Sequence, residues 1–387
     1  MYPALAVLQE ILDPERGQED AAEPESLVGS YQDGWLPDSR LLWIGGIGGM
    51  EAELVKRYGL PFEAIPSAGV HGVGLRVLPG NLRQLYHGFR QARRILLHFK
   101  PDVMFFTGGF VAVPVALAGW LPLRGTHRPR SLLYVPDIEP GLALRTLARF
   151  AHSIAVTVEE TRKYLPRKKP VMVSGYPIRR ELKGWNREEA YSKFGLRADL
   201  PTLLVLGGSK GARSINRALL PALPQLLNQM HVIHLTGQLD WTEVVDARAK
   251  LAISMSTEYI ERYRAYPYLH EEIGAAFTVA DLVVSRAGAS TLGELPSFGI
   301  PAILVPYPHA WRYQQVNAQY LAQRGAAVVI PDSELTSELA LTVLSLMEDH
   351  ESLVRMQTAM KDAARPLAAK IIASQLRLLV EVSGGKS

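Results

Sequence analysis

Short apolar runs alternate with amphipathic stretches along most of the 387-residue chain. Runs rich in Val, Ile, Leu and Phe are typical of strands buried on both faces of a sheet, whereas apolar residues at every third or fourth position predict helices. We predict strands at 41–44, 62–65, 102–106, 131–135, 154–157, 171–173, 203–206, 232–235, 282–284, 302–305 and 328–330. Regular alternation of strands and helices predicts an α/β protein with doubly wound parallel sheets.

The α/β pattern stops once and then starts again. The apolar run at 171–173 and the turn Ser174-Gly175-Tyr176-Pro177 end the first series, and a new strand follows at 203–206. The chain length suits two domains of ordinary size. We expect two Rossmann-like domains at 1–176 and 177–365, and a C-terminal helix at 366–387 that returns to the first domain. The polar, acidic segment 15–38 is expected to be a loosely ordered insert.

Composition narrows the class of protein. Apolar content of 48% and charged content of 21% are those of a soluble globular chain. The absence of cysteine excludes disulfides, thiolate chemistry and Cys-ligated metals, and it fits a reducing cytoplasm. No apolar run reaches the roughly 18–20 residues that span a membrane. The first residues lack the basic start and cleavage site of a secretory signal.

The formal net charge of +4 conceals a basic segment between residues 66 and 130. Its only acid is Asp102, and aromatic and leucine side chains lie between its cations, which are Arg76, Arg83, Arg90, Arg93, Arg94, Lys100, Arg124, Arg128 and Arg130. Such a face suits anionic phospholipid. Nucleic acid would attract the same charges, but no nucleic-acid-binding module is recognisable, so we expect none as a partner. A solvated helix face is the third interpretation.

The stretch 281–317 carries the densest set of candidate ligand-binding residues. A buried strand ends in the small-residue turn at 286–289, and a helix carrying Glu294 follows. Backbone N–H groups and the helix dipole at such a turn attract anions. A carboxylate one helical turn further along can accept hydrogen bonds from a ribose diol. The alternative is an ordinary βαβ unit with a polar surface loop.

Several other enzyme classes lack their signatures in this chain. No strand is followed by GxxxxGK[ST], so a P-loop kinase or ATPase is not expected. No GxGxxG opens the first strand–helix unit, which counts against a dehydrogenase. Neither HExxH nor a carboxylate cluster with metal-ligand spacing is present. We therefore expect neither a metal nor a cofactor.

Three stretches together resemble the donor domain of GT-B glycosyltransferases: GGSKGARSIN at 207–216, SRAGASTLGE at 285–294 and the glutamine-rich loop that follows Trp311. Within that class the chain resembles the MurG family, the UDP-GlcNAc:undecaprenyl-pyrophosphoryl-muramoyl-pentapeptide transferases that make lipid II. GGMEAELV at 48–55 and TGGFVAVP at 107–114 are similar to the N-terminal domain of the family, and SGYPIR at 174–179 is similar to its interdomain segment.

The resemblance implies an inverting transfer of GlcNAc from UDP-GlcNAc to a polyprenyl-pyrophosphate-linked acceptor, in a cleft between the domains. It places the protein in the cytoplasm, peripheral on the inner face of the membrane. Two alternatives stay open. One is a GT-B transferase for another nucleotide sugar or acceptor, and the other is an inactive paralogue that binds a nucleotide sugar.

The resemblance also implies roles for individual residues. Asp137 and Glu139 are candidates for the general base, although either could instead cap the following helix. The implied acceptor-binding residues are His71, Gly108 and Gly109. The implied donor-binding residues are Arg179, Gly208, Ser209, Leu269, Arg286, Gly288, Ser290, Thr291, Glu294, Tyr313, Gln314 and Asn317.

The chain departs from the family pattern in three places. The family begins with a strand and a GGTGGH loop before the helix that here starts at Tyr2; we expect a mis-called start or a fragment, and a gap in the first sheet. The family's HEQN segment reads Tyr134-Val135-Pro136-Asp137. Tyr313 stands where the family has the first glutamine of its sugar-reading pair, and Trp311 precedes it, which leaves the identity of the sugar open.

Overall fold

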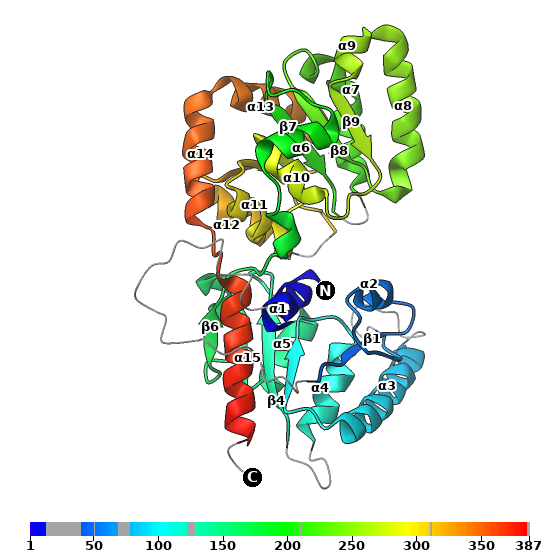
Figure 1. Cartoon of the computed structure of the whole chain (residues 1–387), viewed down its shortest axis with the longest axis vertical. Coiled ribbons are helices and arrows are strands. Elements are labelled where there is room, and N and C mark those ends of the chain that lie inside the picture. Colours follow the sequence, from blue (N-terminus) through cyan, green and yellow to red (C-terminus); the bar gives the residue numbers. More distant parts are fainter. Residues whose placement is uncertain are drawn as a thin grey trace. The chain divides into compact units, whose positions relative to one another are not determined.

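A computed structural model describes residues 1–12, 40–49, 51–68, 78–121, 128–208, 211–309 and 312–384. The chain divides into two compact units (Figure 1). The first comprises 1–177 together with 367–387, and the second comprises 178–366. Each junction lies one residue from the boundary expected from the sequence.

The second unit is built on one parallel six-stranded sheet in the order β12-β11-β10-β7-β8-β9. Its strands are β7 (Thr202–Leu206), β8 (His231–Leu235), β9 (Tyr263–Tyr266), β10 (Leu282–Ser285), β11 (Ala302–Leu304) and β12 (Ala327–Val329). The chain moves outward from β7 to β9 and then resumes on the other side of β7 with β10. The strand order therefore reverses between β7 and β10, where doubly wound sheets bind their ligands.

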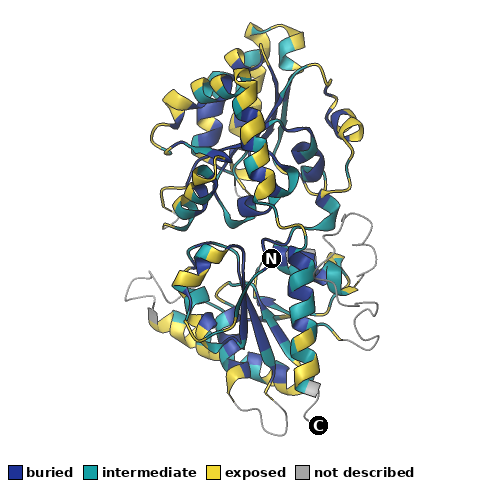
Figure 2. Ribbon diagram, turned by 90° about the vertical axis from the view of Figure 1, so that its left-hand side faces the viewer, coloured by how far each residue is buried: buried dark blue, intermediate teal, exposed yellow. Residues whose placement is uncertain are grey.

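Helices cover both faces of this sheet. The α-helices are α6 (Arg187–Phe194), α7 (Arg213–Leu226), α8 (Trp241–Ser254), α9 (Thr257–Ile260), α10 (Ile273–Val279), α11 (Glu294–Phe298), α12 (Tyr313–Gln323), α13 (Leu335–Glu348) and α14 (His350–Asp362). Side chains of α7 and α13, such as Leu219 and Leu339, pack with Val205, Val284 and Ile303 of the strands. Figure 2 shows the buried strands in dark blue and the exposed outer helix faces in yellow. Burial of these apolar side chains is the main stabilising contribution.

The first unit contains two separate parallel sheets in the part of the chain that the structure describes. One pairs β1 (Trp43–Gly46) with β2 (Phe62–Ile65). The other has the order β3-β4-β5-β6, formed by β3 (Val103–Phe106), β4 (Arg130–Val135), β5 (Ser153–Val156) and β6 (Val171–Val173). Among the described residues, no strand pairing joins these two sheets.

Helices also cover both faces of the four-stranded sheet. The α-helices of the first unit are α1 (Tyr2–Leu12), α2 (Glu51–Arg57), α3 (Leu78–Phe99), α4 (Ala112–Trp120), α5 (Leu142–Phe150) and α15 (Ala368–Gly384). Of these, α2 packs against β1 and β2 instead. Residues of α3, α4 and α5, including Leu96, Val115 and Leu147, pack with strand residues on one face. The C-terminal helix α15 packs against α1, β3 and β4. It therefore belongs to the first unit although it follows the second in sequence.

The predicted fold class, two Rossmann-like parallel α/β units, is confirmed. Strand β1 begins two residues later than predicted, and β9 was not predicted as a strand. The acidic segment 15–38 lies outside the described residues. Among the described helices, none combines the length and apolarity that crossing a membrane requires.

Candidate active site

The turn after β7 depends on three glycines that lie at the strand-order reversal. A Cβ on Gly207 would come within 2.2 Å of the Ala212 nitrogen. Gly208 and Gly211 have φ angles of 81° and 78°, in the left-handed region that side chains disfavour. A Cβ on Gly211 would also lie 2.4 Å from the Thr236 carbonyl oxygen, whereas one on Gly208 would meet no atom within 4 Å. Gly208 is thus the open position, where a ligand can approach the backbone.

The turn after β10 lies next to it, because β10 pairs with β7. Gly288 precedes the 3-10 helix Ala289–Leu292. The Thr291 hydroxyl donates to the Gly288 carbonyl at 2.6 Å, so this side chain stabilises the turn. Both turns stand at the carboxyl ends of adjacent central strands, where doubly wound sheets bind their ligands.

Glu294 begins α11 immediately after this turn. Loss of surrounding water raises the pKa of its carboxyl above the ordinary value, and a hydrogen bond from Ser290 and the positive charge of Arg179 oppose the rise. Two predicted donor-binding residues of the β10 turn, Ser290 and Glu294, are therefore joined by a third, Arg179, from a distant part of the sequence. A carboxylate with a hydroxyl and a guanidinium beside it is suited to hydroxyl groups and phosphates.

Gln314 and Asn317 lie on α12 and hold neighbouring loops. The Tyr307 amide donates to Gln314 Oε1 at 2.8 Å, and Asn317 Nδ2 donates to the Ala287 carbonyl at 3.2 Å. Asn317 is fully buried, so in this structure its amide supports the β10 turn. Tyr313, also predicted to bind the donor, starts α12 and is half-buried.

The remaining residues predicted to bind a ligand differ in where the structure places them. Leu269 is buried, and the exposed Tyr268 before it packs edge-on against His270 at 4.8 Å between ring centroids. Arg286, at the end of β10, forms an ion pair with Asp332. Ser209 and His71 lie outside the described residues, as does Trp311.

A buried polar chain under the β7 turn was missed by sequence reasoning. His234 Nε2 lies 2.9 Å from Asn216 Oδ1, and Asn216 Nδ2 donates to the Thr236 carbonyl at 2.8 Å and to Asp240 at 3.0 Å. Asp240 also accepts from Arg213 Nε at 2.8 Å. These hydrogen bonds connect the first turn of α7 to the loop after β8. No spacing in the sequence links these residues, since they meet only where α7 contacts β8 and the loop that follows β8.

In the first unit, Gly108 and Gly109 follow β3 with φ angles of 106° and 87°, so both positions favour glycine. The Glu139 carboxylate accepts from Arg145 at 3.1 Å, and Arg145 also donates to the Pro140 carbonyl at 2.9 Å. Glu139 therefore holds the loop that precedes α5. Asp137 is half-buried in the same loop.

Tyr134 occupies the position of the histidine in the family's HEQN segment. Its hydroxyl lies 2.8 Å from Thr157 Oγ1 and 3.2 Å from the Gly175 carbonyl. Burial raises the pKa of this phenol well above its ordinary value, and the hydrogen bond with Thr157 opposes the rise. A phenol held in this way is a structural contact between β4, β5 and the segment after β6, and it is not suited to accept a proton.

The glycine turn after β1 is filled by the protein itself. The Gly46 amide donates to Glu51 Oε1 at 3.0 Å, and a Cβ on Gly49 would collide with the same carboxylate. A carboxylate at this turn takes the position that an anion would occupy. The turn after β1 is therefore not an open anion site, unlike the turn at Gly208.

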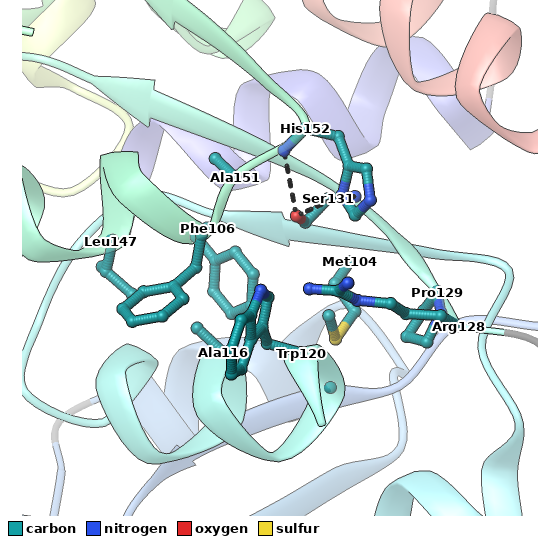
Figure 3. A pocket seen from close by; sticks show the side chains of 12 residues that line it. Met104, Phe106, Ala116, Trp120, Arg128, Pro129, Ser131, Leu147, Ala151 and His152 are labelled. Atoms are coloured by element: carbon teal, nitrogen blue, oxygen red, sulfur yellow. Dashed lines mark hydrogen bonds between the residues drawn. The ribbon is translucent and has the colours of Figure 1, made fainter. Parts of the chain in front are cut away.

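A small cavity lies among β3, α4, α5 and the start of β4 (Figure 3). Its volume is about 10 Å³, room for roughly one water molecule. Ser131 Oγ lies 3.0 Å from His152 Nδ1 at its wall, and burial is the main cause that lowers the pKa of His152 to about 4. A cavity of this size does not hold a sugar or a nucleotide. Among the described residues, no three His, Cys, Asp or Glu side chains are grouped to hold a metal ion.

Comparison with known families matches both halves of the chain. Residues 37–156 match the glycosyltransferase family 28 N-terminal domain, and residues 202–372 match the glycosyltransferase family 28 C-terminal domain. These two matches cover most of both units.

Similar proteins carry one recurring description. A UDP-N-acetylglucosamine--N-acetylmuramyl-(pentapeptide) pyrophosphoryl-undecaprenol N-acetylglucosamine transferase of Roseiflexus sp. (strain RS-1) is 39% identical over 378 residues, which cover 88% of this chain and 83% of the relative. A protein of the same description from Desulforamulus reducens is 36% identical over 85% of this chain and 87% of its own length.

Solved structures share the fold. MurG of Acinetobacter baumannii has a TM-score of 0.67 at 23% identity and covers 97% of this chain and 95% of its own. The UDP-GlcNAc 2-epimerase of Neisseria meningitidis, bound to UDP-GlcNAc, has a TM-score of 0.62 at 12% identity over 87% of this chain and 91% of its own. The predicted family is confirmed by the domain matches and by the curated relatives: the chain belongs to glycosyltransferase family 28.

Proposed function

We propose that the protein transfers GlcNAc from UDP-GlcNAc to a polyprenyl-pyrophosphate-linked muramoyl-peptide acceptor, with inversion at C1. The observation that carries the proposal is the grouping of Arg179, Ser290 and Glu294 beside the strand-order reversal of the second unit. The descriptions of the relatives supply the sugar and the acceptor.

In this proposal the second unit binds UDP. Glu294 accepts hydrogen bonds from the ribose hydroxyls, and the backbone near Leu269 contacts the uracil. The diphosphate lies against the turns that contain Gly208 and Gly288, near Arg179. Backbone amides, a helix N-terminus and a cation stabilise the negative charge that develops on the departing UDP.

Asp137 is the better candidate for the general base that takes the proton of the acceptor hydroxyl. Glu139, the other candidate, is 12% exposed in its side chain and bonded to Arg145, so it holds a loop. A carboxylate base fits an inverting displacement, in which the acceptor attacks from the face opposite the leaving group.

Isothermal titration calorimetry tests the donor. UDP-GlcNAc is expected to bind more tightly than UDP-GalNAc or UDP-glucose. The second candidate function, a transferase for another nucleotide sugar, is favoured by Tyr313 at the position of a family glutamine. Tighter binding of one of the other UDP-sugars would select that function.

We also propose that the basic face of the first unit binds anionic lipid. Along α3, Leu82, Tyr86, Arg90, Arg94 and Leu97 are exposed at intervals of three or four residues, so they lie along one side of the helix. Each cation near an anionic surface contributes roughly 1 kcal/mol. Sedimentation with vesicles of phosphatidylglycerol, compared with phosphatidylcholine, tests this surface; equal binding to both would exclude it.

A further inference from the structure

Arg286 follows β10, and its side chain is only 11% exposed. Nη1 donates to Asp332 Oδ1 at 2.5 Å and to the Val305 carbonyl at 3.2 Å, and Nη2 donates to Ser214 Oγ at 2.6 Å. The guanidinium also lies over the Tyr307 ring, 5.2 Å from its centroid. Each of these contacts is directed to another part of the second unit.

The partners of Arg286 follow three other strands. Ser214 lies in the first turn of α7, after β7; Val305 follows β11, and Asp332 follows β12. In the sheet, β12, β11, β10 and β7 are consecutive neighbours. One side chain therefore connects the carboxyl ends of four adjacent strands.

These contacts form a closed ring. Ser214 Oγ, which accepts from Arg286, donates to Asp332 Oδ1 at 2.7 Å. The positive charge of Arg286 is balanced by Asp332 within the ring. A planar guanidinium can hold several acceptors in fixed directions, which a lysine ammonium cannot do.

We propose that Arg286 is a positioning residue that sets the spacing between the β7 turn, at Gly208 and Gly211, and the turn 286–291 after β10. The inference rests on the proposed function, in which these two turns hold the diphosphate of UDP. The competing role, suggested by the family resemblance, is direct contact between Arg286 and the diphosphate. The two roles predict opposite effects of removing Asp332.

The experiment compares UDP affinity, measured by calorimetry, in the wild type and in the variants R286Q, D332A and S214A. If Arg286 positions the turns, R286Q and D332A each weaken UDP binding about tenfold, since both break the same ring. S214A, which removes a single hydroxyl, weakens binding less. If Arg286 instead contacts the diphosphate, D332A releases the guanidinium and leaves UDP affinity unchanged or higher, which would overturn the proposal.

Affinity for uridine separates a specific loss of diphosphate binding from general destabilisation of the second unit. Uridine lacks the diphosphate, so its affinity is expected to stay within about twofold of the wild type in R286Q and D332A. Equal losses for uridine and UDP would overturn the positioning role. R217Q and E243Q, which break an exposed ion pair of 2.9 Å in the same unit, are the matched controls and should bind both ligands as the wild type does.

A measurement without ligand separates this inference from the proposed function. Hydrogen exchange of the backbone amides at 211–217 and 286–294 is expected to accelerate in both R286Q and D332A, but not in R217Q. Unchanged exchange in both variants would refute the positioning role. Failure of the wild type to bind UDP would refute the proposed function instead, and exchange would then decide the positioning role alone.

Discussion

The imidazole of His234 is fully buried, with Nε2 at 2.9 Å from Asn216 Oδ1 and Nδ1 at 2.8 Å from the Tyr263 hydroxyl. Asn216 Nδ2 faces two acceptors, Asp240 and the Thr236 carbonyl, which fixes its amide orientation. Nε2 of His234 must therefore donate, and Nδ1 accepts from Tyr263. The hydrogen-bond network from Tyr263 through His234 and Asn216 to Asp240 has all its donors and acceptors paired only while His234 is neutral.

The first prediction concerns acid stability of the second unit. Burial lowers the pKa of His234 to about 3, from 6.5 in an unfolded chain. Between these pH values His234 is protonated in the unfolded state but neutral in the folded state. The free energy of unfolding therefore decreases as pH falls from 6.5 towards 3. Across this range the free energy of unfolding decreases by roughly 1.4 kcal/mol for each pH unit. Above pH 6.5 His234 is neutral in both states, so its stabilising contribution is fully present and no longer changes with pH.

Urea unfolding of the wild type and H234Q at pH 7, 6 and 5 measures the effect. H234Q is expected to be less stable at pH 7 but to lose less stability on acidification. H350Q, at an exposed histidine of α14, is the control and should follow the wild type. Parallel pH profiles for the wild type and H234Q would show that His234 titrates normally in the folded protein.

The second prediction concerns Glu294. E294Q keeps the shape of the side chain but replaces charge-assisted hydrogen bonds to the ribose with neutral ones, at a cost of about 1–2 kcal/mol. UDP affinity should therefore fall roughly 10-fold, as measured by calorimetry. E338Q, at an exposed site on α13, is the control. Unchanged affinity in E294Q would remove Glu294 from the donor site.

The third prediction separates two glycines of the β7 turn. G208A places a methyl group in open space, so it costs about 1 kcal/mol of backbone strain but obstructs a diphosphate at the turn. G211A adds the collision with the Thr236 carbonyl and should cost roughly 3 kcal/mol. Urea unfolding and UDP calorimetry should show that G208A mainly loses affinity and G211A mainly loses stability. The reverse order would contradict the assignment of Gly208 as the open position.

The fourth prediction concerns the general base. D137N should lower kcat by about 100-fold or more while UDP affinity is retained, since a general base contributes roughly that much to the rate. E139Q should instead lower the stability of the first unit by about 1 kcal/mol through its weakened bond to Arg145. Steady-state kinetics and urea unfolding distinguish the two. A larger loss of kcat in E139Q than in D137N would assign the general base to Glu139 instead of Asp137.

The fold was largely predictable because buried parallel strands have a simple signature. Runs such as Leu203–Leu206 and Leu282–Val284 were identified from apolar residues alone, and their alternation with helices specified the doubly wound class. Strand β9, with the sequence Tyr-Arg-Ala-Tyr, lies at the edge of its sheet and has no such run. Its sequence alone did not indicate a strand.

The candidate site was predictable where a local motif carries it. The turns at 207–212 and 286–291 and the carboxylate of Glu294 follow from short sequence patterns. The ring formed by Arg286, Ser214 and Asp332 does not, because its members are brought together only by the order of strands in the sheet. The roles of Gln314 and Asn317 in holding loops likewise depend on the tertiary contacts of α12.

The central claim is the transfer of GlcNAc to a lipid-linked acceptor. The most direct measurement is the movement of radiolabel from UDP-[14C]GlcNAc into the lipid fraction by the purified protein, with a polyprenyl-pyrophosphate-linked muramoyl-pentapeptide as acceptor. We predict that one UDP is released for each labelled sugar that enters the lipid, in a β-linkage. Binding of UDP-GlcNAc without transfer of label, or transfer from a different UDP-sugar only, would contradict the proposed function.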